Sequence, residues 1–516
     1  MALKTLVIGN GSCAFDIVDN LLSKNVEVII ATRDNSLHQK FSEIMGQNIT
    51  EIHTETTIHS CTGAIGNFTI SMKNNNKSII RIVDCIVIAE DSFRKTLFAS
   101  YGLSPSTKTI SLSDLDNPEN YKNIADENKS FVLLKGLKFE SNPVISKEVM
   151  DSSIKLASHG QSKIYILTKN LKVAGNRLEA LYRKAKKAGI IFIKFTDSEP
   201  EFFQGEDGKT CIEFTDEVTK KNFSLTPDIT VVDESIVPSD YLETLAKTFG
   251  LNIDCSGFLQ SDNVHRLPAY TNRKGIFVAG PSRGISSPED YKAEAGTAAI
   301  AVLNNSDKNN YDIKDKAYIN KGGCVRCLTC YRICPHKTIS LNSTLSVMPE
   351  GCEGCGLCTA ECPKNAITIE NLDHKFLIPD DKIQNADSAS KPRITAFCCS
   401  RSAAEAYKLA VSIGLTLPEG LKIVEVPCAG SISLTHILNS LKNSTGGTII
   451  LTCHEGNCFS EKGNVFAHNR AKSVSKMISD AGYKKERLMT YTIASNMGKE
   501  FSNILNDFEK NIIDLE

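Results

Sequence analysis

Eight cysteines in a short central segment constrain this chain more than any other feature. Between residues 321 and 370 they form two sets with the same spacing: gaps of two, two and three residues, then Cys-Pro. Two-residue gaps let three thiolates surround one corner of a cubane cluster, and the fourth cysteine, before proline, points away toward a second cluster. The spacing therefore predicts two [4Fe–4S] clusters that exchange their fourth ligands.

This exchange assigns the ligands. We expect the first cluster to be bound by Cys324, Cys327, Cys330 and Cys362, and the second by Cys352, Cys355, Cys358 and Cys334. Structural zinc is the alternative, but four-cysteine zinc sites usually pair two CxxC motifs and do not need the three-residue gap before proline. The spacing resembles that of bacterial two-cluster ferredoxins, so we predict a ferredoxin domain over residues 321–370.

Composition excludes several classes of protein. Lys plus Arg number 59 and Asp plus Glu 60, which leaves none of the basic excess expected of a nucleic-acid binder. No apolar run reaches the roughly 18–20 residues of a membrane span, and the chain begins with a strand rather than a signal peptide. We expect a cytoplasmic protein without direct membrane insertion, whose membrane contact, if any, comes through partner subunits. Outside the clustered positions, we expect buried structural thiols at Cys13, Cys61, Cys85, Cys211 and Cys255.

A glycine-rich turn near residue 10 points to an adenine dinucleotide. The pattern Gly9-x-Gly11-x-x-Ala14 follows an expected strand and opens an expected helix. Its glycines permit a tight turn and close approach to a pyrophosphate, and the alanine permits close packing of helix on strand. The candidate FAD-binding residues here are Gly9, Gly11, Ser12 and Ala14. The acid that normally holds the ribose is absent, and Arg33 stands near its place, facing a phosphate or solvent. A vestigial, empty site is the alternative.

The first 300 residues or so alternate strands and helices, which is typical of an α/β fold. One long strand is expected over residues 79–89 and a hairpin over 202–214. The run 275–280 resembles the closing strand of two-dinucleotide flavoproteins and makes Gly280 a further flavin candidate. We predict a Rossmann-type FAD domain from residues 1–90 and 230–303, a middle α/β domain at 91–229, and linkers at 304–320 and 371–393. The middle domain has one glycine where a nicotinamide motif needs three, so we expect no nicotinamide site.

The last 120 residues or so, 394–516, form a separate α/β domain with cysteines after three expected strands. The carboxyl ends of parallel strands share one edge of a sheet, where open α/β folds place their ligands. We therefore predict a [2Fe–2S] cluster there. We favour the ligands Cys399, Cys428, Cys453 and Cys458, with Cys398 as a possible substitute because it should still point into its strand. A zinc site and a redox-active Cys398–Cys399 dithiol are the alternatives.

The parts together resemble two known families. Residues 58–70, 181–190 and 275–299 look like the flavin-bearing A subunit of heterodisulfide reductase. The tail resembles the delta subunit of methyl-viologen-reducing hydrogenase, whose cysteines bind a [2Fe–2S] cluster. The pattern of that family opens with Cys-Cys-x-x-Cys. This chain has Ser402 where the family has the third cysteine. Fusions of the two modules also occur in the B-type subunit of a quinone-interacting oxidoreductase.

The resemblance implies an electron-transfer subunit of a multisubunit oxidoreductase. It would relay electrons between a [2Fe–2S] cluster, two [4Fe–4S] clusters and FAD, with flavin-based bifurcation or confurcation as one role. The implied partners are subunits of hydrogenase, heterodisulfide reductase or quinone-interacting type. No acid–base pair for substrate chemistry is evident, so no catalytic residue is assigned. The alternatives are a flavin-free iron–sulfur wire or scaffold and an independent NAD(P)H- or disulfide-linked reductase.

Overall fold

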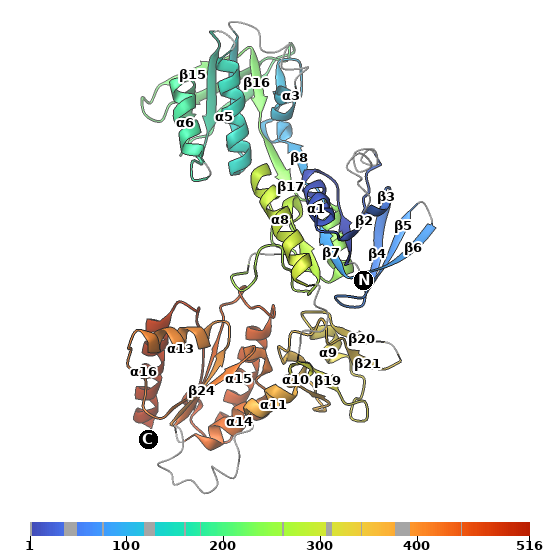
Figure 1. The fold of residues 1–516 in the computed structure, drawn as a ribbon. Helices are drawn as coiled ribbons and strands as arrows, with labels where there is room; N and C mark the ends of the chain where they lie inside the picture. Colours follow the sequence, from blue (N-terminus) through green and yellow to red (C-terminus); the bar gives the residue numbers. More distant parts are fainter. Residues whose placement is uncertain are drawn as a thin grey trace. The chain divides into compact units, whose positions relative to one another are not determined.

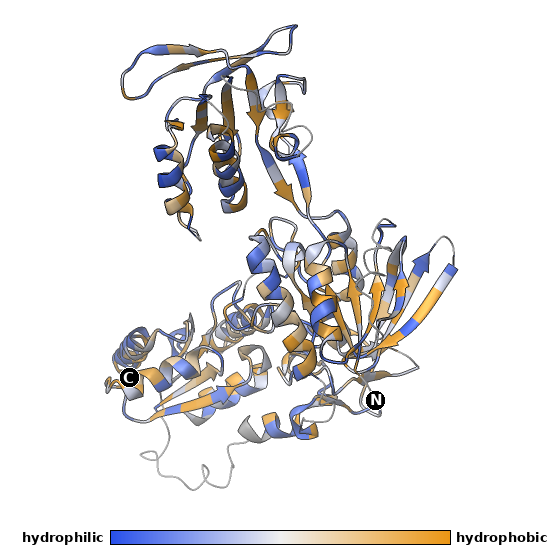
Figure 2. Ribbon diagram, turned by 45° about the horizontal axis from the view of Figure 1, so that its top comes forward, coloured by the Kyte–Doolittle hydropathy of each residue, from blue (hydrophilic) through white to orange (hydrophobic). Residues whose placement is uncertain are grey.

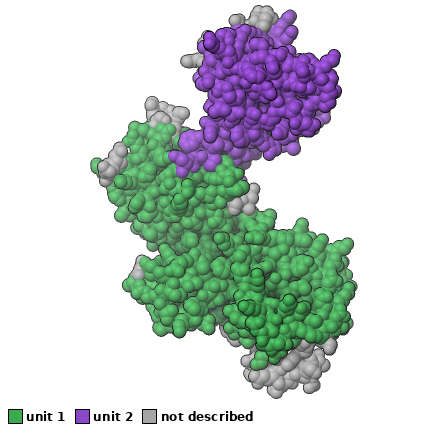
Figure 3. All heavy atoms as spheres, turned by 180° about the vertical axis from the view of Figure 1, so that it is seen from behind, with its two compact units in different colours: residues 1–89, 241–279, 294–516 green, residues 90–240, 280–293 purple. Residues whose placement is uncertain are grey.

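The computed structural model describes residues 3–35, 49–74, 77–117, 129–158, 161–175, 177–260, 263–305, 312–341, 343–376, 393–444 and 446–515. The chain divides into two compact units (Figure 3). The first comprises Met1–Ala89, Tyr241–Ala279 and Glu294–Glu516, and the second comprises Glu90–Asp240 and Gly280–Ala293. Within the described ranges, no helix combines the length and apolar character needed to span a bilayer.

The first unit begins with a five-stranded parallel sheet of order β18-β7-β1-β2-β3 (Figure 1). Its strands are β1 (Lys4–Ile8), β2 (Glu27–Ala31), β3 (Ile49–His53), β7 (Cys85–Ile88) and β18 (Ile276–Val278). The helix α1 (Ser12–Leu22) carries the chain from β1 to β2. Since β2 and β7 flank β1 on opposite sides, the glycine turn after β1 lies where the strand order changes direction, the usual ligand position in such sheets.

The apolar run 79–89 forms two strands rather than the one expected. An antiparallel meander contains β4 (Thr56–Thr62), β5 (Phe68–Asn74) and β6 (Lys77–Val83), whereas β7 belongs to the parallel sheet. Asp84 separates β6 from β7 and accepts a hydrogen bond from the backbone N–H of Lys4 at 2.8 Å. The side chains of Ile80 and Ile82 are exposed on β6, while all of β7 is buried. The single-strand expectation was wrong because continuous hydrophobicity does not reveal this change of environment.

The second unit contains another five-stranded parallel sheet, of order β12-β11-β10-β16-β9. Its strands are β9 (Thr109–Ser111), β10 (Ser130–Lys135), β11 (Lys163–Thr168), β12 (Ile191–Lys194) and β16 (Ile229–Val232). The helices α3 (Leu112–Asp116), α5 (Pro143–Ala157) and α6 (Leu178–Lys187) accompany it. An antiparallel sheet of β13 (Glu201–Gln204), β14 (Thr210–Thr215) and β15 (Asn222–Leu225) contains the expected hairpin.

The limits of the units differ from the expected domain limits. The expected second flavin segment starts at residue 230, but that residue lies inside β16, which pairs with β10 of the middle sheet. A ribbon of β8 (Phe93–Thr96) and β17 (Glu234–Val237) follows, and the first unit resumes at α7 (Tyr241–Phe249). Gly280 opens a short 3-10 helix, η2 (Gly280–Ser282), in the second unit. The helix α8 (Pro288–Asn304) begins in the second unit and ends in the first.

The cysteine-rich segment folds as two similar halves. Two antiparallel pairs join β19 (Tyr318–Ile319) to β22 (Ile367–Thr368) and β20 (Ile339–Leu341) to β21 (Leu345–Val347). A short helix lies within each cysteine set, at α9 (Thr329–Ile333) and α10 (Leu357–Ala360), just before the set's last cysteine, and α11 (Glu370–Phe376) comes after β22. The first strand thus lies in the expected linker 304–320, and α11 extends into the expected linker 371–393.

The two halves repeat unusual backbone angles between their cysteines. Arg326 and Leu328 of the first half have φ of 54° and 63°, and Gly354 and Gly356 of the second have 63° and 74°. These left-handed residues alternate with cysteines, so that the chain curls around each cysteine set. Glycine adopts this conformation readily, whereas a side chain at such a position is strained. The second half therefore adopts these left-handed angles at glycines, whereas the first half adopts them at residues with side chains.

The carboxy-terminal domain is a four-stranded parallel sheet of order β24-β23-β25-β26. Its strands are β23 (Ile394–Cys399), β24 (Leu421–Val426), β25 (Gly447–Thr452) and β26 (Leu488–Thr492). Its helices are α13 (Ala403–Ser412), α14 (Leu434–Asn443), α15 (Gly463–Asp480) and α16 (Gly498–Leu515). Apolar residues dominate the strands (Figure 2), and two separate hydrophobic cores cover the two faces of this sheet.

We predict that Gly356→Ala destabilises the first unit by about 1–3 kcal/mol, because a β-carbon there would be strained and crowded. It would lie 2.5 Å from the Cβ of Ser431 and 2.6 Å from Cδ2 of Leu372. The matched control is Gly322→Ala, whose new β-carbon meets nothing closer than Asn320 Oδ1 at 3.4 Å. Thermal unfolding followed by circular dichroism should show a lower midpoint for Gly356→Ala alone. Equal midpoints for both variants would contradict the tight contact of α10 with the tail domain.

Candidate iron–sulfur and flavin sites

The structure brings the first predicted cysteine set together across the two halves. Cys324, Cys327, Cys330 and Cys362 line one small pocket that is partly open to solvent. Burial raises the pKa of the Cys330 thiol, and the neighbouring thiols of this group raise it further. The cysteine before the second proline thus lies with the first three cysteines, in the arrangement that the exchange of fourth ligands requires.

The second set gathers in the same way around a separate cavity. Cys334, Cys352, Cys355 and Cys358 line this second small pocket, which is again partly open to solvent. Burial raises the pKa of Cys355 to about 12 and that of Cys358 well above its usual value. Thiols with such pKa values keep their protons at neutral pH unless a cation replaces them. Their chemistry suits metal binding, which releases those protons.

The two groups differ in exposure and charge. Cys327 is exposed, and its neighbours Arg326 and Arg332 are exposed as well. The segment 318–333 carries three basic residues and no Asp or Glu. The second half instead carries Glu350, Glu353 and Glu361 in the segment 349–362, which has no basic residue. Positive charge near the first group favours added electrons there. At the second group, Lys316 donates to the carbonyl oxygen of Cys352 at 2.7 Å and Arg470 pairs with Glu361, so the acidic residues are partly balanced.

The four favoured tail cysteines come together on one side of the carboxy-terminal sheet. All are buried, and they belong to one hydrophobic core: Cys399, Cys428, Cys453 and Cys458. Their thiols interact directly, since Cys399 and Cys458 both contact Cys453, and Cys458 also contacts Cys428. Hydrogen bonds from Cys428 and Cys453 lower the pKa of Cys458, while contacts with Cys399 and Cys458 raise the pKa of Cys453. Four thiols so close together titrate as a group rather than one by one.

The amino end of α15 packs directly on these sulfurs. A β-carbon at Gly463 would overlap Cys428 Sγ and lie 3.4 Å from Cys458 Sγ, so only glycine fits. The backbone N–H of Asn464 in the first turn of the helix helps to lower the pKa of Cys458. A helix amino terminus stabilises thiolates through its unpaired N–H groups and its dipole. No local sequence pattern marked Gly463 as a neighbour of these sulfurs.

Cys398 lies on the other face of the sheet. It belongs to the opposite hydrophobic core, and its sulfur lies 3.8 Å from the carbonyl oxygen of Ala396. Burial raises its pKa, and the charges of Cys399 and Glu425 raise it further. Adjacent residues of a strand point to opposite faces, so only Cys399 of this pair joins the other tail thiols.

Ser402 occupies the third position of the opening motif. Its side chain is fully buried, and among the described residues its hydroxyl has no hydrogen-bond partner of normal geometry. It nevertheless helps to lower the pKa of the Cys399 thiol to about 7, after the larger contribution of Cys453. The hydroxyl is therefore placed where a fifth sulfur would otherwise stand, beside the tail group.

The second group and the tail group are neighbours. Cys355 packs against the core that contains the tail thiols, and the charge of its sulfur raises the pKa of Cys428. The hydroxyl of Ser460 in the tail domain hydrogen-bonds to Cys355 and lowers its pKa. The charge of Cys330 in the first group also raises the pKa of Cys358. The three groups therefore follow one another in the order first, second, tail.

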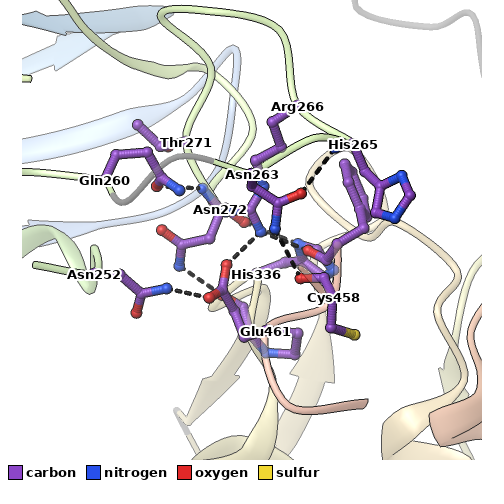
Figure 4. A network of polar contacts seen from close by, with 12 residues as sticks. Asn252, Gln260, Asn263, His265, Arg266, Thr271, Asn272, His336, Cys458 and Glu461 are labelled. Carbon is purple, nitrogen blue, oxygen red and sulfur yellow. Dashed lines mark hydrogen bonds and ion pairs between the residues drawn. The ribbon is translucent and has the colours of Figure 1, made fainter. Parts of the chain in front are cut away.

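Side chains between α7 and β18 of the first unit tie both neighbouring groups to the flavin-type sheet (Figure 4). Asn272 donates through Nδ2 to the carbonyl oxygen of Pro335 at 2.8 Å, and its own carbonyl pairs with His336 Nδ1 at 2.8 Å. Asn263 donates through Nδ2 to the carbonyl oxygen of Cys458 at 3.1 Å. No sequence signal in the separate domains marks these contacts, because each joins residues more than sixty positions apart.

The glycine turn has the geometry of a dinucleotide site. Gly9 and Gly11 have φ of 143° and 94°, and α1 starts directly after Gly11 without an acid in its first turn. Ser12 is exposed at that helix end, whereas Ala14 is fully buried against the sheet. Arg33 stacks over the ring of Tyr241, with its guanidinium carbon 4.5 Å from the ring centre. The backbone thus fits a pyrophosphate, and Arg33 stands beside an aromatic ring in place of the ribose acid.

Some cysteines outside these three groups are less buried than expected from the sequence. Cys255 is exposed, so the expectation that it is a buried thiol was wrong. Cys13 and Cys85 are buried, and Cys61 and Cys211 are half-buried. As placed, no group of three or more His, Cys, Asp or Glu side chains in the described ranges could hold a single metal ion. The first and second groups instead surround cavities.

Two family models match the chain. Residues 394–516 match the methyl-viologen-reducing hydrogenase delta subunit, and residues 316–363 match a 4Fe-4S dicluster domain. The second match starts before residue 321, in agreement with the position of β19.

Curated relatives match different parts of the chain. The A subunit of the ferredoxin:CoB-CoM heterodisulfide reductase of Methanosarcina mazei is 23% identical over 345 residues, covering 66% of this chain and 43% of that protein. The chain thus spans less than half the length of that relative. The iron-sulfur D subunit of the F420-non-reducing hydrogenase of Archaeoglobus profundus is 30% identical over 122 residues, covering 24% of this chain and 89% of that protein.

A solved structure of thioredoxin reductase from Lactococcus lactis covers 58% of this chain and 98% of its own, at 16% identity and a TM-score of 0.41. Through residues 394–516 the chain belongs to the family of methyl-viologen-reducing hydrogenase delta subunits, and it joins this domain to a dicluster ferredoxin domain and to a flavoprotein domain like that of the heterodisulfide reductase A subunit.

Proposed function

We propose that this chain is an electron-transfer subunit that relays electrons between a tail [2Fe–2S] cluster, two [4Fe–4S] clusters and FAD. The observation that carries the proposal is the gathering of the predicted cysteines into three groups, with the second group next to the tail group. Each group offers four sulfurs, which is the donor set of both cluster types.

The proposed ligand sets follow these groups. The first [4Fe–4S] cluster takes Cys324, Cys327, Cys330 and Cys362, and the second takes Cys352, Cys355, Cys358 and Cys334. The [2Fe–2S] cluster takes Cys399, Cys428, Cys453 and Cys458. When bound, the clusters supply one-electron transfer, and FAD supplies exchange between one-electron and two-electron carriers. Gly9, Gly11 and Ser12 would hold the pyrophosphate end of FAD, while Ala14 lets helix α1 pack closely on the sheet, and Arg33 is a further candidate.

The protein's own side chains control the surroundings of these cofactors. The amino end of α15 and the hydroxyls of Ser402 and Ser460 place positive ends of dipoles near tail and second-group sulfurs. Such dipoles favour the more negative, reduced form of a cluster. Apolar cores keep water away from the tail sulfurs, which strengthens these interactions.

The proposed partners are subunits of hydrogenase or heterodisulfide reductase complexes, as the names of the two relatives suggest for those proteins. A component of a quinone-interacting complex is the second possibility within the same proposal. In either case the tail domain would meet one partner, and the flavin domain would connect to another carrier. Coupling of two electron paths at the flavin, that is bifurcation or confurcation, belongs to this proposal.

Anaerobic purification should give about ten irons and about ten acid-labile sulfides per chain. About eight of each come from the two cubanes and about two from the tail. One FAD per chain is also expected after acid extraction. A protein with the irons but no flavin would favour the wire or scaffold, and zinc without iron would contradict the proposal. Rapid bleaching by NAD(P)H would favour an independent reductase.

Cys399→Ala should remove the [2Fe–2S] signal from electron paramagnetic resonance spectra and about two irons, because it deletes a proposed ligand. The matched control is Cys398→Ala, the same change at the adjacent residue on the opposite face of the sheet. This control should keep the signal and the iron. If Cys398→Ala loses the signal while Cys399→Ala keeps it, the proposed ligand set is wrong.

Gly11→Val should lower FAD affinity by about tenfold or more, since a branched side chain at φ of 94° adds strain of about 1–3 kcal/mol where the pyrophosphate approaches. The iron content should not change. Gly414→Val introduces the same side chain at φ of 71° in the tail domain, with nothing within 4 Å, and serves as the control. FAD content that falls equally in both variants would contradict the assignment of the glycine turn.

A further inference from the structure

Residues of the flavin domain surround the loop that carries Cys458, the last cysteine of the tail group (Figure 4). Asn263 donates to the carbonyl oxygen of Cys458, and Arg266 donates to the carbonyl oxygen of the next residue, Phe459. Arg266 also forms an ion pair with Glu461, to which Asn252 donates a hydrogen bond. We call these five residues the clasp: Asn252, Asn263, Arg266, Phe459 and Glu461.

The clasp is a buried and specific contact. The side chain of Arg266 is only 4% exposed and that of Glu461 is 22% exposed. Removal of one partner of a buried ion pair leaves an uncompensated charge and is strongly destabilising. The guanidinium of Arg401 in the tail domain stacks on Phe459, 3.6 Å from the ring centre, with Arg266 5.4 Å from the same centre.

The clasp contacts the backbone at Cys458, one of the proposed ligands, and just after it. The loop runs from Cys453 to Cys458, and both cysteines belong to the core that contains the other tail sulfurs. Two of the clasp's contacts end on the carbonyl oxygens of Cys458 and Phe459, so they fix the peptide that sets the direction of the Cys458 side chain. The adjoining Asn272 does the same beside the second group, through the carbonyl of Pro335, next to Cys334.

We propose that Asn263 and Arg266 are positioning residues for the tail cluster, so that the flavin domain completes a metal site whose ligands all lie in another domain. This inference rests on the proposed function, because it presumes a cluster on the tail thiols. It goes beyond that function in assigning the geometry of the tail cluster to a domain more than one hundred residues away in sequence. The tail domain alone would then bind its cluster more loosely than the full chain does.

The test uses the full-length chain with Asn263→Asp. This change keeps an oxygen to accept from the His265 N–H, at 2.9 Å in the wild type, and replaces the amide donor to Cys458 with a charged carboxylate oxygen. The matched control is Asn506→Asp on α16, which adds the same charge and removes a donor to the carbonyl oxygen of Thr416 at 3.1 Å. A second pair compares Arg266→Met with Arg487→Met, whose guanidinium donates to the carbonyl oxygen of Gly446 at the opposite end of β25.

The readouts are the resonance spectrum of the reduced [2Fe–2S] cluster and the rate at which an iron chelator removes its iron. For Asn263→Asp and Arg266→Met we expect a shifted or broadened [2Fe–2S] signal and loss of tail iron at least several times faster than in wild type. The [4Fe–4S] signals should stay unchanged, and both controls should match wild type. If Arg266→Met does not fold, Asn263→Asp still decides the matter.

Two negative outcomes differ. A wild-type protein without a [2Fe–2S] signal would refute the tail cluster of the proposed function, and the positioning role with it. A wild-type signal that both clasp variants reproduce, with chelation rates equal to those of the controls, would overturn the positioning role alone. The clasp would then join two domains without acting on the cluster.

Discussion

The structure depends on a balance between buried sulfur and positive charge. Thiols gathered away from water keep their protons, as the raised pKa values of Cys355, Cys358 and Cys453 indicate. Sulfur can bind iron only as thiolate, and the negative charges then need compensation within the protein. Bound iron would supply most of that compensation, and helix α15 and nearby hydroxyls would supply part of the rest. Folding of the ferredoxin segment and assembly of its clusters are therefore expected to be coupled.

The same requirement explains how the parts of the first unit fit together. The last cysteine of each set lies with the other half, so neither half of the ferredoxin segment completes a group alone. The second group contacts the tail through Cys355 and Ser460, and the clasp ties the tail to the flavin-type sheet. A continuous sequence of sulfur groups thus depends on contacts between domains.

Local spacing made much of this arrangement predictable. The ferredoxin cysteines could be grouped because two- and three-residue gaps fix which thiolates face one corner, and the tail cysteines because parallel strands end at one edge. The alternation of a strand separated Cys398 from Cys399 in the same way. Contacts over long sequence distances were not predictable. Asp84 divides an apolar run between two sheets, β16 pairs within the middle sheet, and Arg266 meets Glu461, all through tertiary packing that local patterns do not encode.

The most direct test of a continuous electron path is the magnetic interaction between the reduced clusters. In the anaerobic full-length protein, reduced stepwise with dithionite, the [2Fe–2S] signal should relax faster and split once the second [4Fe–4S] cluster becomes paramagnetic. Cys355→Ala should abolish that change while leaving the [2Fe–2S] signal itself in place. A [2Fe–2S] signal that relaxes as an isolated cluster at every stage of reduction would contradict a continuous path.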